Sequence, residues 1–301
     1  MKQLFGAIAI CLLLVSNSFA CEVCGCAAGS VYSGILPRFN KNFVGARYFY
    51  RSFKTQHITT DNSELYTKEY YHTWDLYARF YPHKRVQIFA SLPINHNRQY
   101  DNGALVSTTG IGDIQLWANY AAIQTSDSSL SKIKHLLLLG GGLKMATGES
   151  NYYRNGNLLN PNLQLGSGSW DLLFNYMYTM RIKGWGMQAD GYAKITTTNP
   201  AGFKFGNRFS QAFRGFYWYQ KNKVALLTHI NAQYEFAFKD KTLGETLIES
   251  GGHTLSAGAG LDLYLGRFIL GVQAQQPVYH KQAENLITPN TRILGQFTVL
   301  F

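Results

Sequence analysis

The chain has 301 residues, of which 15% are charged and 15% aromatic, and its 28 Lys and Arg against 17 Asp and Glu give a net charge of +11. Apolar residues make up 46% of the chain, which is enough to bury a core and excludes an intrinsically disordered protein. No interior segment approaches the roughly 20 consecutive apolar residues of a membrane-spanning helix, so a helical membrane protein is excluded too. Few charges and many aromatics are typical of a β-barrel seated in lipid, in which apolar and polar residues alternate.

Residues 1–20 have the features of a secretory signal peptide. A basic second residue is followed by an apolar run from Leu4 to Val15 and by the small residues Ser18 and Ala20. We therefore predict export, with cleavage after Ala20. Cys21 would then be the first mature residue, which leaves its lipidation as an alternative, although a Leu usually stands where this chain has Ser18.

Residues 21–40 form a short segment that contains Cys21, Cys24 and Cys26. In an oxidising compartment, three cysteines leave one thiol over after any single disulfide. Thiolates at this spacing also suit Cu(I), or part of a Zn site that lacks its fourth ligand. We predict a metal site at the three cysteines, with a disulfide plus one free or lipidated thiol, or other redox chemistry, as the alternatives. The small residues of the segment are neither strand-like nor strongly polar, so we interpret it as a hatch inside the barrel.

Beyond residue 40, apolar and polar residues alternate with period two, which is the signature of strands. Trp74 and Leu76 share one parity, for example, and Asp75 and Arg79 share the other. The pattern predicts about twelve strands, most of them longer than the ~5–6 residues usual in globular proteins and suited to a tilted crossing of a bilayer. The predicted strands are 41–54, 69–82, 84–97, 111–124, 133–146, 169–182, 185–196, 207–220, 223–238, 253–265, 267–279 and 290–301.

The connections between these segments alternate between tight turns and long polar links. The predicted tight turns are 82–84, 183–184, 220–223 and 265–267, and residues 125–132 form a longer exception among them. Transmembrane barrels have short periplasmic turns and longer external loops, so this alternation is expected of them. An even number of strands places both ends of the barrel on the periplasmic side. The predicted long links are 55–68, 98–110, 147–168, 197–206, 239–252 and 280–289.

The last predicted strand ends on Phe301, the final residue. An alternating apolar strand that closes on a C-terminal Phe resembles the signal by which bacterial outer-membrane barrels are recognised for assembly. We therefore predict that residues 41–301 form an all-β, antiparallel, up-and-down transmembrane barrel of the bacterial outer membrane. Its expected partners are outer-membrane lipid and the barrel assembly machinery.

Three segments next to long links carry a family resemblance. Residues 109–116 read TGIGDIQL, residues 141–148 read GGLKMATG and residues 165–171 read LGSGSWD. Together they resemble the outer-membrane channel-like family of the Meta-pathway of phenol degradation, a distant relative of the long-chain fatty-acid transporters. The second motif departs from the family, which usually has Leu-Pro in place of Met145-Ala146. The resemblance implies an outer-membrane channel or transporter for small hydrophobic or aromatic solutes and does not fix the substrate.

A barrel of twelve strands encloses more space than a barrel of eight strands, whose interior is just filled by side chains. The inward parity carries polar residues of both signs together with large apolar ones. For the carboxylates just inside a rim, such as Asp113 and Asp171, we favour pairing with Lys or Arg over binding of a substrate. The predicted lining of the solute path comprises Asp75, Arg79, Asp113, Gln115, Trp117, Asp190, His229, Glu235 and Asp262.

The sequence contains no Gly-x-Ser-x-Gly, His-Glu-x-x-His or Rossmann motif. His229 and Glu235 are six residues apart on one strand face, about 20 Å along an extended chain, which is too far to bond. Basic residues are scattered rather than grouped, which argues against a nucleic-acid partner. We therefore predict a non-enzymatic channel or transporter, linked through its cysteines to copper or other metal handling. The alternative is a structural or metal-binding barrel that conducts nothing.

Overall fold

The computed structural model describes residues 41–58, 64–101, 104–125, 131–154 and 157–301. Within these ranges, twelve long strands follow one another in chain order around an antiparallel barrel, and β1 pairs with β19 to close it. The predicted barrel is confirmed, and every predicted strand overlaps an observed one. The twelve are β1 (Phe43–Ile58), β2 (Glu64–His83), β3 (Val86–Asp101), β5 (Gln115–Gln124), β6 (Ile133–Lys144), β9 (Asp171–Ile182), β10 (Trp185–Ile195), β12 (Arg208–Lys221), β13 (Val224–Ala237), β16 (Gly252–Leu265), β17 (Phe268–Gln282) and β19 (Arg292–Leu300).

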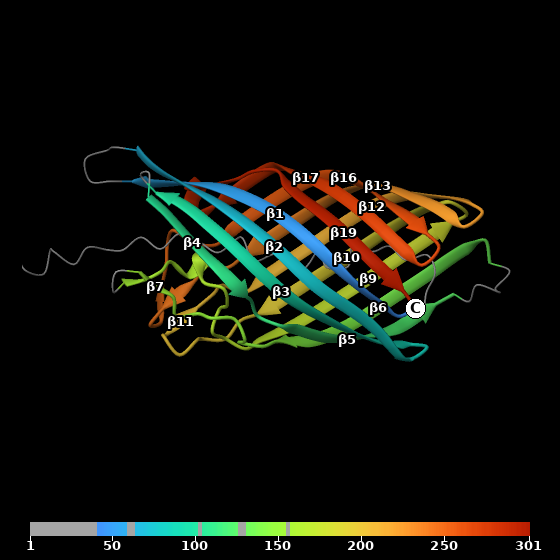
Figure 1. The fold of residues 1–301 in the computed structure, drawn as a ribbon, viewed down its shortest axis with the longest axis horizontal. Coiled ribbons are helices and arrows are strands. Elements are labelled where there is room, and N and C mark those ends of the chain that lie inside the picture. The colour runs from blue at the N-terminus through green and yellow to red at the C-terminus, as the bar shows by residue number, and fades with distance from the viewer. Residues whose placement is uncertain (1–40, 59–63, 102–103, 126–130, 155–156) are drawn as a thin grey trace, which may run out of the picture.

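The two ends of the barrel differ in their connections. Tight turns join β9 to β10, β12 to β13 and β16 to β17, and each begins with a residue of positive φ: Lys183, Asn222 and Gly266. Positive φ is what a short hairpin turn requires if its twist is to match that of the strands. The C-terminus lies at this end, and β4, β7 and β11 lie at the other (Figure 1). We call the end with the tight turns the periplasmic end and the opposite one the external end.

The outward face of the barrel is apolar. Trp74, Leu139, Phe213, Ile230 and Phe297 are among the large apolar side chains exposed on it. A continuous exposed apolar surface of this kind is stable only in lipid. Aromatic pairs lie toward both ends of the belt, as in other transmembrane barrels: Tyr48 with Trp74 at 4.8 Å between ring centroids, and Trp185 with Tyr217 at 4.7 Å.

No helix in the described part of the chain is long and apolar enough to cross a membrane.

Two of the links predicted as loops are largely strand. β1 and β2 stay paired as far as Ile58 and Glu64, and β4 (Ala104–Ile111) pairs with the outer half of β3. Continued pairing satisfies backbone groups that a loop would leave to water, so the sheet extends beyond the lipid belt at the external end. The remaining short elements are β7 (Tyr153–Arg154), β8 (Asn157–Leu158), η2 (Pro161–Leu163), β11 (Phe203–Lys204), β14 (Lys241–Thr242), β15 (Glu245–Thr246), η3 (Ala283–Asn285) and β18 (Ile287–Pro289).

Candidate functional site

Inward side chains form an apolar layer in the half of the barrel nearest the periplasmic end. The rings of Phe89 and Trp117 stack with centroids 4.4 Å apart, and Tyr77 stacks on Phe89 at 6.0 Å. At this level the lumen is packed with side chains and differs from the wide aqueous channel of a general porin. The apolar layer consists of Phe43, Tyr77, Phe89, Trp117, Leu173, Phe216, Ala225, Leu227, Tyr264, Ile269 and Leu300, with Tyr192 and Trp218 packed against it.

A buried ion pair lies against one side of this layer. Arg47 of β1, only 1% exposed, pairs with Asp75 of β2, and Asp75 also accepts a hydrogen bond from Ser91 Oγ at 2.6 Å. The guanidinium carbon of Arg47 lies 4.1 Å from the ring centroid of Tyr77, within the range of a cation–π contact. The charge of Asp75, predicted to line the solute path, is therefore already neutralised by a neighbour.

Arg79 and Trp117, both predicted to line the path, belong to the same region. The guanidinium carbon of Arg79 lies 4.4 Å from the ring centroid of Phe43, and its Nη2 donates to the Lys41 carbonyl at 3.1 Å. Trp117 is 6% exposed and stacked in the apolar layer. The narrow part of the lumen thus combines aromatic faces with a guanidinium group.

A second polar set lies beside the apolar layer, on β10, β12, β13 and β16. The positive charge of Arg214 is within electrostatic range of Asp190, Asp262 and His229. Gln188 donates to Asp190 Oδ1 at 3.1 Å, and Gln296 donates to Asp262 Oδ1 at 2.9 Å. Three of the predicted path residues are therefore brought together around one guanidinium group.

Several buried polar atoms of this set have hydrogen-bonding capacity to spare. Arg214 Nε and Nη1, His229 Nδ1 and Asp262 Oδ2 have no hydrogen-bond partner among the described residues. Buried polar groups are normally satisfied, by protein, water or ligand. These atoms can therefore bind water or the polar group of a solute in the lumen.

Glu235 takes part in an ion pair that crosses the lumen. It lies on β13 and pairs with Arg292 of β19, and β16 and β17 separate these two strands in the barrel wall. His229 lies six residues from Glu235 on the same strand, as expected, so the two do not form an acid–base pair. The predicted path residue Glu235 is thus held in place by a basic partner.

The three motifs of the family resemblance meet at the external rim of the barrel. Lys144 Nζ lies 2.7 Å from Asp113 Oδ2 and 3.2 Å from Asp171 Oδ2, and all three side chains are nearly inaccessible. Asp113 Oδ2 also accepts hydrogen bonds from the N–H of Ser167 at 2.9 Å and from its hydroxyl at 2.8 Å. The pairing favoured for the two carboxylates is confirmed. We call Asp113, Lys144, Ser167 and Asp171 the rim cluster.

The glycines of these motifs allow the backbones to approach closely. A Cβ on Gly166 would lie 2.4 Å from the Gly148 carbonyl oxygen and 2.5 Å from Asp113 Oδ1. Gly148 N–H in turn donates to Asp113 Oδ1 at 3.0 Å. Any side chain at position 166 would push the loop away from the rim cluster. Gln115, the remaining predicted path residue, lies two residues beyond Asp113, and its Oε1 has no hydrogen-bond partner in the described ranges.

Some residues of the site were not predicted from the sequence. Arg47 and Tyr77 lie at the narrow part of the lumen, and Arg214 links the second polar set, yet none was among the predicted path residues. Strand parity was the available signal, because all three occupy the inward parity of their strands. Parity alone does not show which inward side chains from distant strands meet.

The predicted signal peptide and the predicted metal ligands Cys21, Cys24 and Cys26 lie outside the described residues. Among the residues that the structure describes, there is no group of three or more His, Cys, Asp or Glu side chains placed to hold a metal ion.

No protein-family model matches the chain. No curated protein matches it either. Among solved structures, an outer-membrane channel from Pseudomonas putida F1 has a TM-score of 0.67 and 14% identity, and the match covers 88% of this chain and 97% of that one. The β-domain of the Bordetella autotransporter BrkA has a TM-score of 0.52 and 10% identity, covering 87% of this chain and 100% of its own. At these identities the likeness establishes the fold. That fold, together with the apolar outer face, is the architecture of a bacterial outer-membrane barrel.

We expect a large loss of stability when Lys144, the cation of the rim cluster, is removed. Lys144→Met would leave two buried carboxylates without a positive partner, and we expect it to lower the free energy of unfolding by about 3–5 kcal/mol. Urea unfolding of the barrel in lipid vesicles, followed by tryptophan fluorescence, measures this loss.

The matched control is Lys239→Met at the surface of the external end. Lys239 pairs with Glu284 at 3.2 Å, and the hydrogen bond from Lys239 lowers the pKa of Glu284, but the two side chains are 38% and 50% exposed. Exposed pairs contribute little to stability, so this variant should unfold like the parent. Equal stability of the Lys144→Met variant and the parent would contradict the role of the rim cluster.

Proposed function

We propose that the protein is an outer-membrane channel for small hydrophobic or aromatic solutes, with a path through the barrel lumen. The observation that carries the proposal is the apolar layer with a set of unsatisfied polar atoms beside it. A solute with a ring and a polar group would place the ring against Phe89 and Trp117 and its polar group near Arg214. A general aqueous porin requires no such layer, because its interior is a polar, water-filled channel.

Two further observations support an outer-membrane channel. The fold is shared with a protein described as an outer-membrane channel. The motifs at residues 109–116, 141–148 and 165–171 resemble the Meta-pathway channel family, and their side chains form one structural unit, the rim cluster. We propose membership of that family on these grounds. The competing proposal is a structural barrel that conducts nothing.

Single-channel conductance in planar bilayers separates the two proposals. We expect the parent to conduct weakly, because the apolar layer occupies the lumen. Removing two stacked rings in a Phe89→Ala/Trp117→Ala variant should raise the conductance several-fold. The control is Leu172→Ala/Phe174→Ala, which removes two exposed side chains from the outward face of β9 and should leave the conductance unchanged. Absence of conductance in the parent and in the double lumen variant would contradict the channel proposal.

The C-terminal strand fits the proposed recognition by the barrel assembly machinery. Phe301 is 67% exposed, and its N–H donates to the Asn42 carbonyl at 3.0 Å, next to the seam between β1 and β19. The aromatic ring at the end of the chain is therefore accessible to a partner at the periplasmic end.

We propose, as a separable part of the function, that Cys21, Cys24 and Cys26 bind Cu(I) or Zn and link the channel to metal handling. Three thiols within six residues are a suitable soft donor set for these ions. Metal analysis of the purified protein tests this. We expect bound copper or zinc in the parent and its loss in a Cys24→Ser/Cys26→Ser variant, whereas equal metal content in both would refute the proposal.

A further inference from the structure

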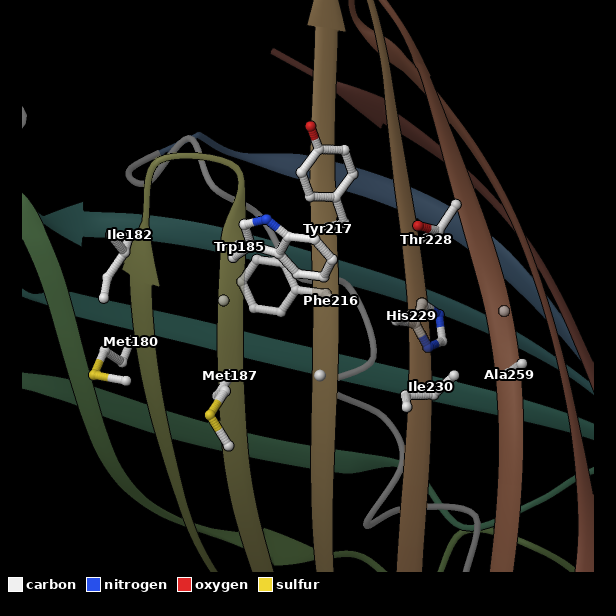
Figure 2. A pocket seen from close by; sticks show the side chains of 13 residues that line it. Met180, Ile182, Trp185, Met187, Phe216, Tyr217, Thr228, His229, Ile230 and Ala259 are labelled. Atoms are coloured by element: carbon white, nitrogen blue, oxygen red, sulfur yellow. The ribbon is translucent and has the colours of Figure 1, made fainter.

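The outward face of the barrel contains an apolar groove near the periplasmic end. The groove has a volume of about 890 Å³ and lies over β9, β10, β12, β13 and β16. This volume is within the ~300–1,000 Å³ range of small-molecule sites. Figure 2 shows Trp185 and Tyr217 toward the hairpin turn, with Met187 and Ile230 farther along their strands.

A missing side chain creates the groove. Gly215 of β12 lies between Met187 and Ile230 in the register of three neighbouring strands, and those two side chains are 63% and 70% exposed. A Cβ on Gly215 would meet only Ile230 Cγ1, at 3.9 Å. Gly215 therefore forms an open floor between two walls, and the paired rings of Trp185 and Tyr217 cover the end nearest the turns.

Basic side chains lie on the turns at the periplasmic end of the groove. The turns above it carry exposed Lys183, Lys221, Lys223 and Arg267 and contain no Asp or Glu. Backbone hydrogen bonds fix these turns against their neighbours: Trp218 N–H of β12 donates to the Gly184 carbonyl at 2.7 Å, and Gly266 N–H donates to the Lys223 carbonyl of the next turn at 3.1 Å. The four basic residues thus lie on neighbouring turns at one end of the barrel.

The distance between these basic turns and the groove floor suits one lipid leaflet. Six residues separate Gly215 from Lys221, about 20 Å along a strand. A strand tilt of about 40° reduces this to about 15 Å along the membrane normal. That depth is half of the ~30 Å hydrocarbon core, so a headgroup at the lysines can place an acyl chain over Gly215.

We propose that this groove is a binding site for an anionic phospholipid of the periplasmic leaflet. One acyl chain lies over Gly215 between Met187 and Ile230, and the phosphate is held by Lys183, Lys221 and Lys223. Each basic group near an anionic membrane surface contributes favourably, and the apolar groove adds a contact that a smooth barrel wall lacks. The acyl chain lies on the outward face of the barrel, whereas the proposed solute path lies in the lumen.

Lipid titration followed by native mass spectrometry tests the site. The probes are dioleoyl phosphatidylglycerol and dioleoyl phosphatidylcholine, which differ only in the headgroup. We expect the anionic lipid to bind the parent about tenfold or more tightly than the zwitterionic one, because several basic groups contribute. Lys183→Gln/Lys221→Gln/Lys223→Gln should remove most of this preference. Gly215→Leu should weaken the binding of both lipids, because its side chain fills the groove.

Matched controls lie elsewhere on the barrel. Lys84→Gln/Arg85→Gln/Lys132→Gln removes the same charge from other exposed periplasmic turns, and Gly295→Leu adds the same side chain at an outward glycine whose Cβ would meet nothing within 4 Å. Both should bind lipid like the parent. Heat-dependent gel migration, which is characteristic of folded barrels, verifies that each variant is folded. Gly215→Ala, which adds only a methyl group, is a second test of the groove. Equal loss in the two triple variants, or unchanged lipid binding in both Gly215 variants, would overturn the proposal.

Discussion

The structure depends on one constraint: in lipid, every backbone N–H and C=O group must find its partner inside the protein. The pairing of β1 with β19 meets this constraint, because it removes the two free edges that an open sheet would expose. Closure also fixes which side chains face lipid. Since strand parity assigns every second residue to the outside, apolar residues occupy that parity along the lipid belt and most charges occupy the other.

Placing charges inside a barrel of twelve strands creates a second requirement, that they be neutralised there. Arg47 with Asp75, Lys144 with Asp113 and Asp171, and Glu235 with Arg292 meet it through ion pairs between strands. Arg214 and its neighbours meet it less completely and retain free hydrogen-bonding capacity. The apolar layer lies beside this capacity, so in the proposed channel the same interior that stabilises the barrel would select the solutes that pass.

Much of the fold was predictable from the sequence, because strand periodicity and turn residues are local signals. The twelve strands, the tight turns at Lys183 and Gly266, and the inward positions of the predicted path residues all followed from them. The continued strands at the external end were missed, since segments 55–68 and 98–110 lie beyond the lipid belt and were predicted as loops, whereas β1 with β2 and β3 with β4 continue as hairpins. The meeting of Arg214 with Asp190 and Asp262 was also beyond prediction, because it depends on which distant strands become neighbours.

We propose that the apolar layer makes the lumen selective for small aromatic solutes. Uptake into proteoliposomes tests this selectivity, using benzenesulfonate, an aromatic anion, against a monosaccharide of similar size. We predict that the protein accelerates uptake of benzenesulfonate more than that of the sugar, relative to protein-free vesicles. Faster uptake of the sugar, or no acceleration of either solute, would contradict the account.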